Sequence, residues 1–228
     1  MTRARPTTPV RRKLAFLAGF ALYFAVLWLV WETPIVYPLK VSVVMLHEIS
    51  HGIAALATGG TIDRIVLDPA QGGACYCPGG NAFLTLSAGY LGSLLWGILL
   101  LGLASRTRPP PTAVLTAAGA IVAILTLLYV RSAFGLLFGI AFGTVLVLFG
   151  RKLGEHLSRM ALRVLGLTSC LYAILDIKSD VLDRPHLRSD AAMLAEITPL
   201  STTAWGFVWT AVALLVCAVA FRRAYRSA

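Results

Sequence analysis

The sequence predicts an all-α integral membrane protein, a polytopic helical bundle of about seven spans with a small β-hairpin or re-entrant insertion. Of its 228 residues, 58% are hydrophobic and 13% are charged, and the mean hydropathy is +0.80. Soluble domains contain about a quarter charged residues. The apolar residues also fall into blocks close to the roughly 20 residues that cross a bilayer as a helix. Composition and block length therefore both indicate a membrane-embedded chain.

Seven apolar blocks are expected to form the helices. The clearest polar break is Arg106 to Pro111. The first block follows basic residues, as in a signal peptide, but it is long for that role and no small-x-small cleavage site follows it, so we interpret it as a retained span. Gly89, Gly92 and Gly97 predict close packing of the third block against the second. The blocks cover residues 14–31, 38–58, 82–103, 112–130, 133–150, 160–178 and 203–221.

Residues 59–81 differ from the blocks on either side. Thr61 to Pro69 mixes apolar and polar residues at strand-like spacing, and several glycines follow. We expect a short hairpin or re-entrant loop, because backbone at membrane depth must be covered by protein or must line a water-filled cavity. Residues 14–221 then form a single membrane-embedded domain, between a basic N-terminal tail (1–13) and a basic C-terminal tail (222–228).

The formal net charge of +10 gathers at the ends of the apolar blocks. Lys and Arg in such places anchor helices at the membrane surface and set their orientation, so we expect a lipid bilayer and not nucleic acid as the partner. The expected location is a cell membrane, the bacterial plasma membrane in particular. Orientation stays open, because basic residues before the first span favour a cytoplasmic N-terminus while seven crossings would place the basic C-terminal tail outside.

The four cysteines predict no disulfide framework. Cys170 and Cys217 lie in apolar blocks, where a thiol behaves as a small hydrophobe. Cys75 and Cys77 are one residue apart, too close to join separate elements. Cysteine usage therefore does not indicate a compartment.

The second block carries ionisable residues that an apolar span does not need. His47 and His51 are four residues apart, so on a helix they share one face, and Glu48 follows the first histidine. Two imidazoles at this spacing can bind one Zn²⁺, and the carboxylate is placed to act as general base. Each ionisable residue inside a span costs about 2.5–3.5 kcal/mol or more, which a bound metal would offset. We therefore predict a catalytic zinc site with His47 and His51 as ligands and Glu48 as the base.

The residues around this motif are similar to those of a known family. The segment His47-Glu-Ile-Ser-His-Gly-Ile-Ala-Ala-Leu-Ala-Thr-Gly-Gly60 resembles the site-2 protease family of intramembrane zinc metalloproteases, particularly its compact bacterial branch. The resemblance implies a helical membrane core, one zinc ion and proteolysis of membrane-protein substrates. It extends over about residues 38 to 210, through Gly72-Gly73, Leu86 to Ser93, Leu171 to Ile177, Ser189 to Ala191, and Trp205.

The third zinc ligand is less clearly indicated. Catalytic zinc usually has three protein ligands and one position for water. In the family that this chain resembles, the third ligand is an aspartate on a later span, often followed by glycine. Asp176 lies near the end of the sixth block but precedes Ile177, so the Asp-Gly pattern is absent. We predict Asp176 as the third ligand. Asp180 and Asp190 are kept as alternatives, although for these two we favour a solvated carboxylate at the membrane interface.

These features predict a zinc metalloendopeptidase that hydrolyses peptide bonds in or next to the bilayer, in regulated proteolysis of membrane proteins. The substrate must be locally unwound, and residues 59–81 could pair with it as an added strand. The alternative is a non-proteolytic membrane protein that uses the site for metal binding or as a scaffold. The sequence does not support an interpretation as a transporter, because it has no internal symmetry. The substrate, the cleavage site and the oligomeric state do not follow from the sequence.

Overall fold

The structure is a computed structural model that describes residues 9–31, 33–183 and 188–227. In this part of the chain, seven helices are long and apolar enough to cross a membrane, which confirms the predicted helical bundle. A π-helical turn, Ser179–Asp183, and a short helix α7, Asp190–Ile197, follow the sixth span and were not predicted. The seven long helices are α1 (Pro9–Val30), α2 (Tyr37–Ala57), α3 (Ala82–Ala104), α4 (Pro111–Tyr129), α5 (Ala133–Lys152), α6 (Gly154–Lys178) and α8 (Thr202–Ser227).

The basic segments at the two termini are more helical than expected. α1 begins at Pro9 and α8 continues to Ser227, so both helices extend into the predicted tails; residues 1–8 of the N-terminal tail lie outside the described residues. Aromatic packing between the helices accounts for this. The Phe16 and Phe221 rings are 5.5 Å apart, and the Lys13 ammonium lies 5.4 Å from the Tyr225 ring centroid.

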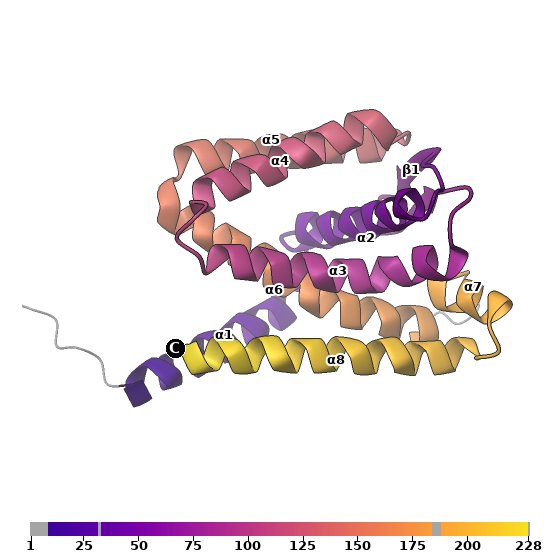
Figure 1. Ribbon diagram of the computed structural model, residues 1–228. Coiled ribbons are helices and arrows are strands. Elements are labelled where there is room, and N and C mark those ends of the chain that lie inside the picture. Colours follow the sequence, from indigo (N-terminus) through magenta and orange to yellow (C-terminus); the bar gives the residue numbers. More distant parts are fainter. Residues whose placement is uncertain (1–8, 32, 184–187, 228) are drawn as a thin grey trace, which may run out of the picture.

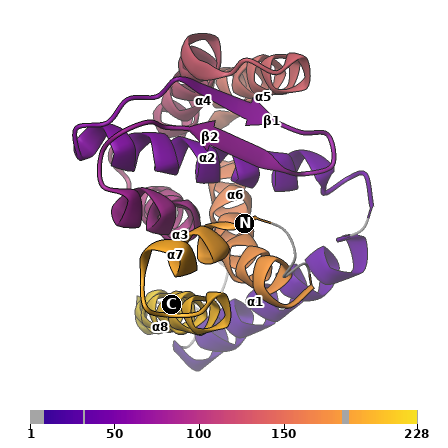
Figure 2. The same ribbon diagram turned by 90° about the vertical axis from the view of Figure 1, so that its right-hand side faces the viewer.

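The predicted hairpin is present between α2 and α3. Its strands β1 (Arg64–Leu67) and β2 (Gly73–Tyr76) are antiparallel, with Val66 opposite Ala74. β1 is fixed on its other side to the connection between α4 and α5, where the Ser132 hydroxyl accepts a hydrogen bond from Leu67 N (3.0 Å) and donates one to Leu67 O (2.9 Å). Figure 2 shows both strands lying over α2. The hairpin thus covers α2 and leaves β2 on the side of the third helix.

The helices define two ends of the bundle, which Figure 1 shows at opposite sides. The hairpin end contains the two strands, α7 and the starts of α3 and α8, whose Phe83 and Trp205 rings are 5.5 Å apart. The terminal end contains the start of α1, the end of α8 and the end of α3. There the Arg159 guanidinium near the start of α6 donates to Ala104 O at 2.6 Å.

The second helix is placed differently from the other six. Near its start, Tyr37 donates a hydrogen bond to Pro69 O in the hairpin turn (2.7 Å); at its end, Thr58 accepts one from Asn81 N just before α3 (2.9 Å). The segment between α2 and α3 therefore holds α2 at both of its ends. α2 is also the most buried of the seven helices, and its Met45 and Ile49 pack in one core cluster with strand β1. This enclosure shields its polar residues from lipid.

Candidate metal centre

The histidines of α2 lie together in the interior of the hairpin end. Helical periodicity places the His47 and His51 rings 4.8 Å apart, in a T-shaped arrangement. Their residues are 9% and 6% exposed. Two buried imidazoles on one helix face need polar partners, because polar groups in an apolar interior are costly when they are left unpaired.

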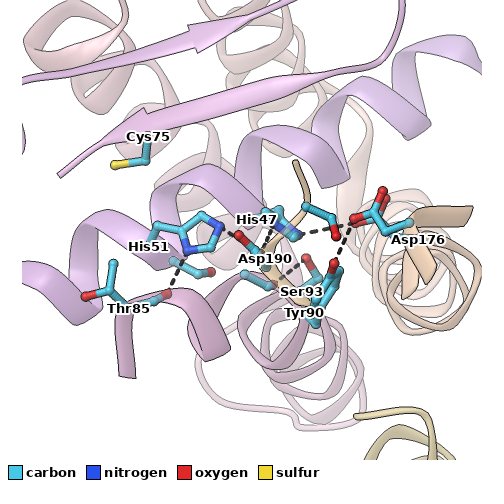
Figure 3. A network of polar contacts seen from close by, with 12 residues as sticks. His47, His51, Cys75, Thr85, Tyr90, Ser93, Asp176 and Asp190 are labelled. Atoms are coloured by element: carbon cyan, nitrogen blue, oxygen red, sulfur yellow. Dashed lines mark hydrogen bonds and ion pairs between the residues drawn. The ribbon is translucent and has the colours of Figure 1, made fainter. Parts of the chain in front are cut away.

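Asp190 supplies that partner from the other end of the sequence. Its Oδ2 atom lies 3.0 Å from His47 Nε2 and 3.2 Å from His51 Nε2, as Figure 3 shows. Ligands bonded to tetrahedral zinc at about 2.0–2.1 Å are separated by about 3.3 Å, so the two distances from the carboxylate to the imidazoles are close to the spacing that one zinc ion requires. One ligand atom from each residue lies within 4.8 Å of the others. Two imidazoles and a carboxylate are also a donor set that Zn²⁺ accepts.

The third ligand predicted from the sequence differs from the one that the fold brings in. Asp176 Oδ2 lies 3.4 Å from His47 Nδ1, on the opposite side of the ring from Asp190. Asp180 instead accepts a hydrogen bond from the Tyr90 hydroxyl at 2.7 Å. Asp190, for which we favoured a solvated carboxylate, is only 9% exposed. The reason is that the chain turns back after α6. Asp190, the first residue of α7, then lies beside Gly89 of α3 and contacts the histidines of α2.

The sequence around Asp190 fixes its position locally. Ser189 caps α7, accepting a hydrogen bond from Ala192 N at 3.3 Å, so the carboxylate belongs to the first turn of the helix. Burial alone would raise the pKa of Asp190, but the neighbouring His51 and His47 hold it below its usual range. The side chain is therefore an anion at neutral pH, the form that binds a cation. The Ser-Asp-Ala segment was noticed in the sequence, and the cap before Asp190 is the signal that could have ranked it higher.

The second nitrogen of each imidazole also has an acceptor. His51 Nδ1 lies 2.7 Å from Thr85 O, and His47 Nδ1 faces Asp176. A hydrogen on each Nδ1 would satisfy these contacts and leave Nε2 as the metal-binding atom. Carboxylate and carbonyl partners of this kind hold the tautomer and orientation of metal-binding histidines. In this arrangement Asp176 faces His47 Nδ1 and stands outside the group of His47, His51 and Asp190.

Helix α3 approaches this group as closely as its backbone allows. A Cβ atom on Gly89 would collide with His47 Nε2 and Asp190 Oδ2. The close packing predicted against the second span therefore occurs for Gly89 at the candidate site and for Gly92 beside Ser50, whereas Gly97 faces Gly166 and Cys170 of α6. Any side chain at position 89 would displace two of the three ligand atoms.

Glu48 lies beside the histidines and against the hairpin. It is 5% exposed, and the backbone of Cys75 hydrogen-bonds its carboxylate. A Cβ on Gly73 would come within 2.6 Å of Glu48 Oε1, so only glycine lets β2 pass this close. A cavity of about 680 Å³ opens here; its lining includes His47, Glu48, His51, Gln71 to Cys75, and Asp190.

The hairpin carries a disulfide that the sequence analysis did not expect. Cys75 and Cys77 are joined, and both side chains line the cavity. We had excluded a bridge because the two residues are too close to connect separate elements. This disulfide instead closes a short loop at the end of β2, next to the strand residues that contact Glu48.

Comparison with known proteins gives one result. The model of the family described as Peptidase M50B-like matches residues 20–220, which include all seven long helices in whole or in part. No curated protein and no solved structure shows a significant match to this chain. A match over so much of the chain, with a His, His and Asp group at its centre, leads to one conclusion. This chain belongs to the Peptidase M50B-like family.

Proposed function

We propose that this protein is a zinc-dependent intramembrane endopeptidase that cleaves membrane proteins in or next to the bilayer. The observation that carries the proposal is the convergence of His47, His51 and Asp190, with Glu48 beside them, on a cavity inside an apolar bundle. Membership of a peptidase family supports the same function. A polypeptide is the substrate that such a cavity, lined by a strand edge, would accept.

Each residue of the site has a separate role in the proposed reaction. His47, His51 and Asp190 would hold one zinc ion. Zinc, when bound, lowers the pKa of water and polarises the carbonyl of the peptide bond. Glu48 takes the proton from the attacking water and passes it to the leaving amine, as a general base and then a general acid. Asp176 and Thr85 keep the imidazoles oriented through their Nδ1 atoms.

Strand β2 supports a way of holding the substrate. One edge of β2 pairs with β1, and among the described residues no strand pairs with its other edge. Residues 73–75 of this strand line the cavity beside Glu48. An extended peptide can add to such an edge through backbone hydrogen bonds, which would also keep it unwound for attack. Deletion of residues 68–80 should therefore reduce cleavage more than zinc content; unchanged cleavage would contradict this role.

The substitution Glu48→Gln tests the function itself. The amide keeps the shape of the side chain but cannot accept the proton, so the variant should retain zinc and lose turnover. Both proteins would be purified with stoichiometric metal analysis and assayed on single-pass proteins from the native membrane. A non-proteolytic scaffold would instead keep its cellular phenotype with glutamine at position 48.

A further inference from the structure

A disulfide lies in the wall of the cavity, and the proposed reaction does not use it. Cys75 and Cys77 are bonded across a single intervening residue, and both side chains line the cavity together with Glu48 and His51. The loop that this bond closes is very short, so the bond removes little conformational entropy from the unfolded chain. The disulfide therefore adds little to the stability of the whole protein, and its position indicates a local role at the site.

The backbone of Cys75 lies at the free edge of β2. Cys75 is opposite Ile65, whose carbonyl oxygen accepts a hydrogen bond from Arg131 N (2.9 Å) on the far side of β1. Ile65 thus directs its backbone groups away from β2, and in an antiparallel pair the opposite residue then directs its own away from β1. At this edge the Cys75 N–H donates a hydrogen bond to the Glu48 carboxylate. The strand edge therefore positions the proposed general base.

The disulfide restrains the end of this strand. After Cys77 the chain passes through Gly79 and Gly80, which both have positive φ angles (77° and 72°). Glycine gives the backbone wide freedom, so these two residues do not restrain the strand end by themselves. The bond to Cys77 does restrain Cys75, whose Sγ atom would lie 3.7 Å from a Cβ on Gly52 of α2. Figure 3 shows Cys75 on the His51 side of the site.

We propose that Cys75 and Cys77 are a redox modification site that controls cleavage: the disulfide form is active, and reduction by a dithiol makes cleavage slow. The effect on cleavage rests on the proposed protease function, whereas the reversible opening of the disulfide does not. Both side chains are only partly buried and line the cavity, so a dithiol can reach the sulfur atoms. Exposed disulfides are the ones that exchange readily.

The exchange proceeds in two displacement steps. One thiolate of the dithiol attacks one sulfur of the pair, forming a mixed disulfide and releasing the other cysteine as a thiolate. The second thiol of the dithiol then displaces the remaining cysteine and closes its own disulfide. Two electrons and two protons pass in total from the dithiol to the cysteine pair, and a disulfide oxidant reverses both steps.

Reduction should act on Glu48 and leave the metal ligands in place. Once the bond is open, the Cys75 N–H is no longer held against the carboxylate, so the base loses a donor that positions it. The loss of a hydrogen bond to a charged group should lower the cleavage rate about tenfold or more. The three ligands come from α2 and α7, which the disulfide does not join, so zinc content should not change.

Alkylation measures whether the site opens and closes. The full chain with Cys170→Ser and Cys217→Ser is purified in detergent and equilibrated with mixtures of reduced and oxidised dithiothreitol. Mass spectrometry after alkylation should show both remaining cysteines modified in the reduced mixtures and unmodified in the oxidised ones, with full return on reoxidation. A pair that stays bonded in excess dithiothreitol, or that never bonds, overturns the proposal.

Cleavage of a single-pass membrane protein and zinc content are measured on the same samples. As the pair is reduced, kcat should fall about tenfold or more at constant zinc, and it should recover on reoxidation. The matched control adds Cys75→Ser and Cys77→Ser, because dithiothreitol also binds zinc. This control should cleave at the reduced rate in every mixture. A control that cleaves like the oxidised parent protein, or a parent rate that does not respond to reduction, overturns the proposal.

The outcomes also separate this proposal from the protease function. Cleavage that is lost with Glu48→Gln but does not respond to the state of the cysteine pair keeps the protease function and overturns the redox control. If the protein cleaves nothing in either state, the protease function fails, and alkylation alone decides whether Cys75 and Cys77 form a reversible site.

Discussion

The assignment of Asp190 as the third ligand gives the sharpest prediction. Asp190→Asn keeps the size of the side chain but removes the charge that faces both Nε2 atoms at 3.0 and 3.2 Å. Asp176→Asn changes a group that faces only His47 Nδ1 at 3.4 Å. Loss of a supporting partner typically costs about 10–100-fold in metal affinity. Such a loss equals about 1.4–2.7 kcal/mol. Replacement of one ligand of three should cost more than about 100-fold, because among the described residues the group holds no second carboxylate.

Zinc competition against a chelator of known affinity measures this difference. Asp180→Asn is the matched control, since Asp180 bonds the Tyr90 hydroxyl and lies outside the ligand group. We expect the affinity to fall most for Asp190→Asn, less for Asp176→Asn and least for Asp180→Asn. Gel filtration in detergent would establish that all three variants remain folded. Strong zinc binding by Asp190→Asn together with its loss in Asp176→Asn would refute the ligand assignment.

Three further predictions concern packing around the site. Gly89→Ala should abolish stoichiometric zinc, because the added methyl collides with two ligand residues, while Gly102→Ala, which meets nothing within 4 Å, should bind zinc normally; metal analysis distinguishes them. Ser132→Ala removes both hydrogen bonds to Leu67, so the cleavage rate should fall while zinc content is retained. Ser105→Ala, which removes a hydroxyl at the terminal end of α3, should leave the cleavage rate unchanged. Equal rates for the two variants would contradict the anchoring role of Ser132. Leu115→Ala, at a fully buried position, should destabilise the protein by about 2–5 kcal/mol, and Leu137→Ala, 74% exposed, by far less, as thermal unfolding in detergent would show.

Helical periodicity alone predicted part of the site. His47, Glu48 and His51 lie within five residues, and a span of this length must be helical in a bilayer to satisfy its backbone. Their side chains were therefore placed correctly relative to one another before any tertiary structure was known. The seven spans and the hairpin were predictable for similar reasons, since hydrophobic block length and strand-like spacing are local properties.

The tertiary structure decided what local properties cannot. Asp190 and His47 are 143 residues apart, and which of three aspartates reaches the imidazoles depends on how the chain returns after α6. The oblique course of α2 also follows only from packing, because length and hydropathy do not determine how a helix is inclined in the bundle. Sequence periodicity records which side of a helix is apolar; the contacts between helices, set by residues as small as Gly89, determine which carboxylate meets the metal ligands.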